Sequence, residues 1–328
     1  MKVVIIGVHG HMGIILRHLD KCSGVSLAGI APGCPEEDIS QRAAAWKSYH
    51  PSLEIYDDYR RMVEEIKPDV AGVGSFYYKN EEITVDLFRR GIHCISEKPA
   101  ALTLEGLEKL KEEHEKSGVE YASMLEMRYG RLFLAAHDSL EKGDIGKPLM
   151  STAQKTYKLG ERSFLFRSRS CFGGTIPFVG IHGIDLILWS MNAPVDEIFA
   201  RHTRQGNASH GELESCGIVG ISFKNGTFAT ANIDFLNPAK ALEHGDDRLR
   251  IAGEKGIIEA KEGKTILVTG EAPPAEIQKD PERFFFVDFL AQIQKKGRCL
   301  VSAKDSFYST EVVLKARQAA DEKRVVKF

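Results

Sequence analysis

The stretch that decides the fold is KVVIIGVHGHMG, residues 2–13. The apolar run Val3–Ile6 has the length and the β-branched content of a buried strand. A glycine-rich segment follows it and opens an amphipathic helical pattern at His11–Cys22. Short apolar runs then alternate with helical patterns as far as residue 122. Strands that alternate with helices indicate crossover units, so we expect an α/β fold with a doubly wound parallel sheet of the Rossmann type.

Five strands and four helices are predicted in this first region. The strands are Val3–Ile6, Val25–Ile30, Val70–Val73, Ile92–Ile95 and Val119–Met124, and the helices are His11–Cys22, Asp57–Lys67, Glu81–Arg90 and Leu104–Ser117. Thr103 is a candidate N-cap for the last helix. The spacing of Leu104, Leu107 and Leu110 places these three side chains on one face of that helix.

After Met124 the pattern changes to strands joined by short turns. Asn225-Gly226, a strong hairpin signal, separates two apolar runs. The predicted strands are Leu149–Tyr157, Gly217–Phe223, Thr227–Phe235, Leu249–Ala252, Gly256–Ala260, Thr265–Thr269 and Val325–Phe328, and the predicted helices are Leu132–Lys142, Ile181–Met191, Pro281–Lys296 and Lys304–Glu322. Consecutive hairpins predict a large, open, mostly antiparallel sheet with helices on one face.

The composition narrows the class of protein. A chain of 328 residues is expected to form two domains, and 43% hydrophobic with 27% charged residues is typical of a globular protein. A net charge of −2 argues against a nucleic-acid or membrane partner. The N-terminus enters a strand at once, without a signal segment. The six scattered cysteines form no Cys-x-x-Cys pair, which argues against a metal site and favours a cytoplasmic location.

The spacing of Gly7, Gly10 and Gly13 is a variant of the dinucleotide-binding fingerprint, with His9 in the place of the second glycine. Backbone N–H groups in such a turn attract a pyrophosphate. We therefore predict a site for NAD or NADP. Six residues of this segment are assigned to the cofactor site: Gly7, His9, Gly10, His11, Met12 and Gly13.

The acidic residue that normally binds the adenosine ribose of NAD is missing at the end of the second strand. Glu36, Glu37 and Arg42 in the following segment are the alternatives. The choice between NAD and NADP therefore stays open.

A Glu97-Lys98-Pro99 tripeptide follows the predicted strand Ile92–Ile95. Ligands of open α/β sheets bind at the carboxyl ends of the strands, so Lys98 is a cation directed at a ligand rather than an ordinary surface lysine. Glu97, Lys98 and Pro99 are assigned to the cofactor site, together with Ser75 after the third strand.

With these motifs the chain resembles the Gfo/Idh/MocA family of oxidoreductases, which includes glucose–fructose oxidoreductase and inositol dehydrogenase. Further matching motifs are Met127-Arg128-Tyr129, Gly143-Asp144-Ile145-Gly146-Lys147-Pro148, Gly173-Gly174-Thr175, Gly180-Ile181-His182-Gly183-Ile184-Asp185 and Gly253-Glu254-Lys255-Gly256. The resemblance implies a dinucleotide-binding domain at residues 1–122. It also implies that residues 123–328 form a second domain for substrate binding and oligomerisation. The last helix of this second domain could pack on the first domain.

The resemblance further implies hydride transfer between a nicotinamide cofactor and a hydroxyl or carbonyl group of a sugar, cyclitol or polyol acid. Lys98 would contact the reacting oxygen and His182 would be the acid/base, so we expect the two groups to converge beside the cofactor. Asp185 would either orient the site or serve the structure. Relatives commonly carry an aspartate four residues before the histidine, but this chain has Phe178. Glu126 is the candidate for the missing carboxylate.

The substrate pocket has four further candidates. Arg167 and Arg169 either bind a carboxylate or phosphate of the substrate or belong to a solvated loop. Lys155 and Tyr157 alternate along one predicted strand and therefore share a face. Two rival functions remain: a non-catalytic ligand-sensing homologue, and a hydrolase or lyase that uses tightly bound NAD transiently. The open sheet face predicts a homodimer or homotetramer.

Overall fold

The computed structural model describes residues 1–278 and 283–328. The chain divides into two compact units, the first containing Met1–Met124 and Arg283–Phe307. The second unit begins at Leu125 and includes Tyr308–Phe328. The predicted boundary follows residue 122, and the last helix was expected to have the option of packing on the first domain. Of that helix, which begins at Ala303, the residues as far as Phe307 belong to the first unit.

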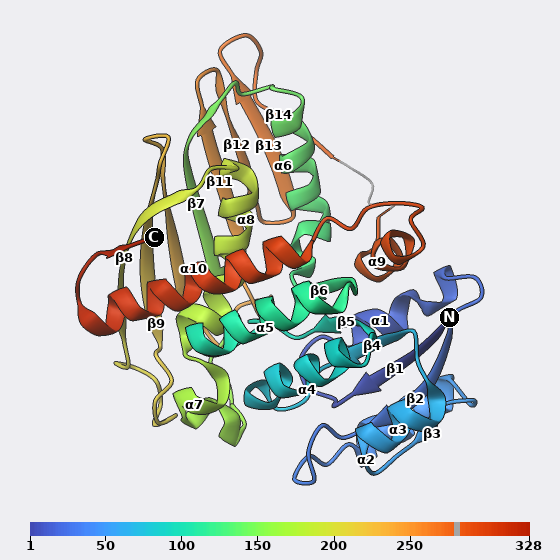
Figure 1. Ribbon diagram of the computed structural model, residues 1–328. Helices are drawn as coiled ribbons and strands as arrows, with labels where there is room; N and C mark the ends of the chain where they lie inside the picture. The colour runs from blue at the N-terminus through green and yellow to red at the C-terminus, as the bar shows by residue number, and fades with distance from the viewer. Residues whose placement is uncertain (279–282) are drawn as a thin grey trace. The chain divides into compact units, whose positions relative to one another are not determined.

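The first unit is built on a parallel sheet, as predicted (Figure 1). Over the described residues it has six strands in the order β3-β2-β1-β4-β5-β6. They are β1 (Lys2–Ile6), β2 (Ser26–Ala31), β3 (Glu54–Ile55), β4 (Val70–Val73), β5 (His93–Ser96) and β6 (Tyr121–Ser123). The strand order reverses between β1 and β4, the point where open α/β sheets bind ligands.

The helices of the first unit match the predicted pattern with one addition. They are α1 (Gly13–His18), α2 (Ser40–Tyr49), α3 (Tyr59–Ile66), α4 (Tyr77–Arg89), α5 (Leu104–Ser117) and α9 (Phe285–Ile293). Helix α2 escaped prediction because Ala43 is its one buried residue, so no apolar stripe marks it. Helix α9 lies within the helix predicted at Pro281–Lys296. The first two residues of that prediction, 281 and 282, lie outside the described part of the chain.

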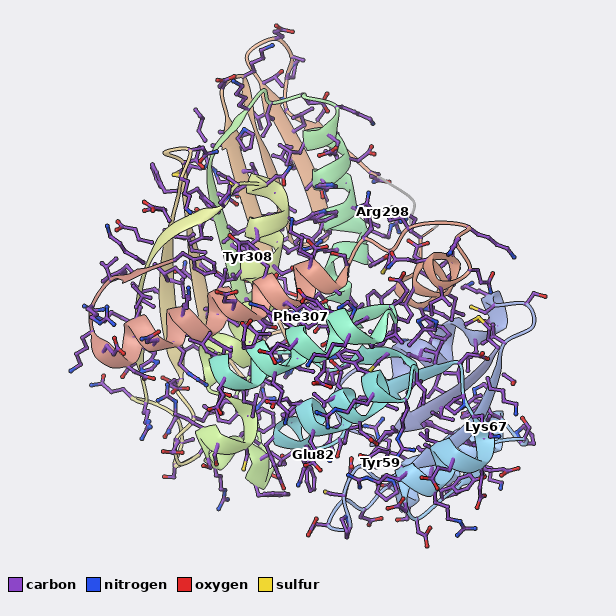
Figure 2. All side chains as sticks on the ribbon, viewed as in Figure 1. Tyr59, Lys67, Glu82, Arg298, Phe307 and Tyr308 are labelled. Atoms are coloured by element: carbon purple, nitrogen blue, oxygen red, sulfur yellow. The ribbon has the colours of Figure 1, made fainter. Side chains whose placement is uncertain are left out.

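Local signals explain the ends of two of these helices. The Oγ1 atom of Thr103 accepts a hydrogen bond from the Gly106 N–H at 3.0 Å, which confirms the predicted cap of α5, although Leu104 is exposed rather than on the buried face. Figure 2 marks Tyr59 and Lys67 at the two ends of α3. Tyr59 is buried, and Lys67 ends the helix in the left-handed region with φ of 51°.

The second unit is built on a mixed, mostly antiparallel sheet. Within the described residues it has nine strands in the order β14-β13-β12-β11-β7-β10-β9-β8-β15. They are β7 (Pro148–Thr156), β8 (Val195–Thr203), β9 (Cys216–Phe223), β10 (Phe228–Asp234), β11 (Arg248–Gly253), β12 (Gly256–Lys261), β13 (Lys264–Thr269), β14 (Ala275–Glu276) and β15 (Val326–Lys327). The pair β7–β10 is parallel, and the other described pairs are antiparallel.

Helices cover one face of this sheet. They are α6 (Arg131–Glu141), α8 (Ile181–Met191) and the part of α10 (Ala303–Glu322) from Tyr308 onward; the short α7 (Arg169–Phe172) belongs to the same unit. Figure 2 labels the consecutive residues Phe307 and Tyr308 of α10, where the chain passes from one unit to the next. Phe307 stacks on Tyr121 of the first unit, and the Tyr308 hydroxyl accepts from the Val195 N–H of the second.

Helix α8 is the central core helix of the second unit. The segment Arg169–Met191 is long and apolar enough to cross a membrane by length and composition, with a mean hydropathy of 1.5. However, 94% of its most apolar window is buried inside the protein, as expected of a core helix. A π-helical turn at Ile176–Gly180 leads into α8.

Candidate functional site

The glycine loop between β1 and α1 is tightly enclosed. Gly7 and Gly10 have φ of +83° and +68°, a region that L residues rarely adopt. A Cβ atom on Gly7 would collide with the backbone of Gly74, and one on Gly10 would collide with the side chain of Glu97. At Gly13 the same position faces open space. The first two glycines therefore serve the turn, and the third leaves room for a ligand.

Glu97 locks the tripeptide after β5 to this loop. Its fully buried carboxylate accepts the backbone N–H of His11 and lies 3.1 Å from His11 Nδ1. Burial alone would raise the pKa of the Glu97 carboxyl, but the adjacent His11 and Lys98 hold it below its ordinary value. Lys98 is itself buried and precedes a cis peptide bond to Pro99. The tripeptide is therefore part of the glycine loop's structure.

Glu37 closes the other side of the loop. Its carboxylate accepts from the N–H of Val8 at 3.1 Å, the N–H of Gly33 at 2.9 Å and the hydroxyl of Ser75 at 2.6 Å. His9 Nε2 lies 3.5 Å from the same carboxylate, whose side chain is 0% exposed. Glu37 is thus committed to the protein and is not free to bind a ribose.

In the second unit, His182 is buried on α8. The next residue, Gly183, packs on β7: a Cβ there would lie 3.3 Å from the Ala153 Cβ and 3.9 Å from the Lys155 Cβ. Helix α8 therefore packs on β7 beside Lys155 at the position that follows His182. The predicted convergence of His182 with Lys98 stays a prediction.

Phe178 fills its position with an aromatic cluster. Its ring centroid lies 5.1 Å from that of Phe166 and 6.1 Å from that of Phe172, both edge to face. All three side chains are buried. At the position where the resemblance leads one to expect an aspartate, Phe178 is thus an apolar anchor of the π-helical turn.

A cluster of ionisable groups lies at the end of β7. The Lys155 ammonium is 2.6 Å from Asp247 Oδ2 and 4.6 Å from the centre of the Tyr157 ring. Burial raises the pKa of Tyr157, with Lys155 opposing that shift. The carboxylates of Asp247 and Glu126 both act on Tyr157, raising its pKa, and their buried oxygens Asp247 Oδ1 and Glu126 Oε2 accept no hydrogen bond from the described residues. The cluster therefore contains a lysine that is already ion-paired, and two buried carboxylate oxygens for which the described residues supply no hydrogen-bond donor.

Sequence reasoning missed Asp247. Strand β11 runs antiparallel to β7 with Arg248 opposite Gln154, so the preceding residue, Asp247, falls beside Lys155. Only this long-range pairing, which no local pattern predicts, could have revealed it.

The arginines of the predicted substrate loop have different surroundings. Arg169 Nε lies 2.8 Å from Glu214, and its Nη2 atom lies 2.9 Å from Asp321. Arg169 is therefore neutralised within the protein, which favours a structural role. Arg167 is exposed on the short 3-10 helix Phe164–Arg167.

Asp185 also serves the structure. Its buried carboxylate binds Arg128 through two nitrogen atoms, at 2.8 and 2.7 Å, and accepts the Ser309 hydroxyl at 2.7 Å. Of the two roles expected for Asp185, these contacts favour the structural one. The described residues contain no group of three or more side chains suited to hold a metal.

Comparison with known proteins assigns the family. Residues 1–124 match the model of the oxidoreductase family with an NAD-binding Rossmann fold, and residues 133–259 match the GFO/IDH/MocA C-terminal domain. The chain belongs to the Gfo/Idh/MocA family of oxidoreductases. The first unit is accordingly an NAD-binding Rossmann domain.

Relatives of this oxidoreductase carry related names. Inositol 2-dehydrogenase of Klebsiella pneumoniae is 25% identical over 264 residues, or 80% of this chain and 75% of its own. Myo-inositol 2-dehydrogenase of Thermotoga maritima is 23% identical and covers 83% of this chain and 84% of its own. A solved Thermotoga maritima structure, provisionally named an oxidoreductase, is 36% identical with a TM-score of 0.95 over 100% of both chains.

Proposed function

We propose that this oxidoreductase oxidises or reduces a neutral polyol, a cyclitol or a sugar, with a nicotinamide cofactor. The relatives named inositol dehydrogenase support a CH–OH group as the reacting centre. The observation that carries the proposal is the cluster at the end of β7. Asp247 Oδ1 and Glu126 Oε2 are buried acceptors that need hydrogen-bond donors, and polyol hydroxyls supply them.

The charges of the second unit favour a neutral substrate over an acidic one. Asp247 neutralises Lys155, and Glu214 with Asp321 neutralises Arg169. A substrate carboxylate near Glu126 and Asp247 would meet like charges, whereas hydroxyl groups would donate to both. The ion pairs of Arg169 argue against its binding a substrate anion, and the exposure of Arg167 is that expected of a solvated loop.

His182 and Lys98 are proposed to act on the reacting oxygen, His182 by transferring its proton and Lys98 by stabilising its negative charge. When bound, the nicotinamide ring accepts or supplies the hydride of the carbinol carbon. Loss of that hydride requires loss of the hydroxyl proton, and an imidazole such as that of His182 suits this transfer near neutral pH. The ammonium of Lys98 would stabilise the negative charge that develops on the oxygen.

A substrate panel tests the proposal. The purified protein is mixed with NAD⁺ or NADP⁺ and with cyclitols, neutral sugars or sugar acids, and reduced cofactor is followed by absorbance. We expect turnover with a neutral polyol, lost in His182→Ala and Lys98→Ala variants that still fold. Turnover of sugar acids alone would refute the neutral class. Dinucleotide binding without any turnover would favour a sensing homologue, and substrate conversion without net reduced cofactor would favour transient use of NAD.

We further propose that the open face of the second unit's sheet joins copies of this chain. Phe199, Ile218 and Phe228, on the adjacent strands β8, β9 and β10, are 40%, 49% and 53% exposed and share the face opposite the helices. We expect a dimer or tetramer by light scattering, which an Ile218→Lys variant dissociates. A wild-type monomer at micromolar concentration would refute this assembly.

A cytoplasmic location is also proposed. All six cysteines are free thiols, which suits a reducing compartment. Cell fractionation checks this location, and recovery of the protein outside the cytoplasm would refute it.

A further inference from the structure

A cavity in the first unit adjoins the glycine loop. It has a volume of about 530 Å³ and is lined by Gly10, His11 and Gly13 at one end and by residues of α1 and α2 at the other. Because α2 follows β2, this side of the loop is where a Rossmann domain holds the adenosine half of its dinucleotide. The cavity is therefore placed to meet the adenosine ribose.

The lining of the cavity is basic and aromatic. Arg17 from α1 and Arg42 from α2 contribute two guanidinium groups, and His50 contributes an imidazole. Trp46 and Tyr49 add rings on which an adenine can stack. No aspartate or glutamate is among the described residues that line it.

A carboxylate side chain that could bind the ribose hydroxyls of NAD is either missing from the end of β2 or already hydrogen-bonded within the protein. Strand β2 ends at Ala31, and Pro32 and Gly33 follow it, so no carboxylate stands at the usual ribose position. Glu37 is fully buried and already accepts three hydrogen bonds. A carboxylate in this state has little capacity left for the two ribose hydroxyls.

Arg42 acts on the glycine loop as well as on the cavity. The pKa of His9 is lowered, first by burial and also by the positive charge of Arg42, although Glu37 opposes the shift. The charge of Arg42 therefore reaches His9, which stands in the place of the second glycine of the fingerprint.

We propose that this cavity binds the 2′-phosphate of NADP(H), so that NADP(H) rather than NAD(H) is the preferred cofactor. The inference rests on the proposed oxidoreductase function and adds its cofactor specificity. Arg17 and Arg42 bind the phosphate, since a guanidinium fork matches phosphate oxygens in two parallel hydrogen bonds. NAD, which carries a hydroxyl there, leaves both cations without an anionic partner.

Calorimetry with adenosine fragments isolates the phosphate. 2′,5′-ADP and 5′-AMP differ only in the 2′-phosphate, and neither needs the second unit or any turnover. We expect 2′,5′-ADP to bind at least about tenfold more tightly, as expected for charged hydrogen bonds. Arg42→Gln should remove about that factor and leave 5′-AMP binding within about twofold. Arg17→Gln should act in the same direction.

Arg60→Gln is the matched control, because Arg60 is an exposed arginine of α3 paired with Glu82 at 3.4 Å. It should change neither affinity. Equal binding of the two fragments, or equal loss of both in Arg42→Gln, would overturn the inference.

NADH and NADPH are then titrated in the same way. Preference for NADPH supports the inference. Tight binding of NADH without such a preference overturns it and leaves the proposed oxidoreductase function intact. Binding of neither dinucleotide would overturn both.

Discussion

Asp185 and Arg128 form a buried, two-pronged ion pair within the second unit, with Nε and Nη2 of the arginine at 2.8 and 2.7 Å from the two carboxylate oxygens. The arginine also lies 5.3 Å from the Trp189 ring. The pair joins the 3-10 helix Glu126–Tyr129 to α8. It therefore links the segment that carries Glu126 to the helix that carries His182.

Removal of Arg128 is expected to leave a buried, uncompensated carboxylate. Arg128→Leu should lower the free energy of unfolding by about 3–5 kcal/mol, measured by urea denaturation. The double variant with Asp185→Leu should lose much less than the sum of the single changes, because it removes both charges. A change below about 0.5 kcal/mol in Arg128→Leu would contradict the importance of this pair.

The glycine loop allows a paired test. Gly10→Ala should destabilise the protein by at least about 1–2 kcal/mol, because Gly10 has φ of +68° and its Cβ would collide with Glu97. Gly13→Ala should be neutral or stabilising, since its Cβ faces open space. Thermal unfolding measures both. Equal melting temperatures for the two variants would show that the loop relaxes around an added methyl group.

Asp247 is expected to matter for substrate binding. Asp247→Asn removes one negative charge beside Lys155 and weakens the acceptor offered to a substrate hydroxyl. A loss of about 10–100-fold in kcat/KM is expected, with stability changed less than activity. Asp246→Asn, which alters the neighbouring pair with Arg248, is the control. Similar kinetics for the two variants would exclude this role.

Glu97 is expected to make the free energy of unfolding depend on pH in the acid range. Its pKa is lower in the folded protein than in the unfolded chain, so the unfolded chain binds the proton first as the pH falls. The resulting stabilisation is complete above the ordinary glutamate pKa of about 4.3 and is lost as the pH falls through the lower folded value. Glu97→Gln should be less stable at neutral pH and lose less stability in that acid range. Urea denaturation at a series of pH values compares the two, and parallel profiles would argue against the effect.

Strong local patterns account for most of what the sequence predicted. Helix α8 was predicted with its observed bounds, Ile181–Met191, and β4 with its bounds, Val70–Val73. Helix α2 was missed because it lacks a buried stripe, and β8 because a register shift between Val195 and Glu197 interrupts the alternation of its buried and outward side chains. Wherever burial follows a regular period, the sequence alone was sufficient.

In the candidate site too, short motifs predicted some residues, whereas the roles of others depend on contacts between distant segments. The glycine spacing and the Glu97-Lys98-Pro99 tripeptide follow directly from short motifs at strand ends. The roles of Glu37, Asp185 and Asp247 do not, because each depends on a partner far along the chain: Val8 lies 29 residues from Glu37, Arg128 57 residues from Asp185 and Lys155 92 residues from Asp247. A motif names the residue but not the hydrogen bonds that its side chain has already made.

By itself, therefore, the sequence determined the two sheets, the nucleotide-binding loop and the family, because each rests on short-range spacing of glycines and apolar residues. Only the tertiary structure decided which charges are already neutralised: Glu37 in the glycine loop, Arg169 beside Glu214, and Lys155 beside Asp247. The physical reason is that the folded packing, which brings distant segments into contact, decides which charges are paired and desolvated.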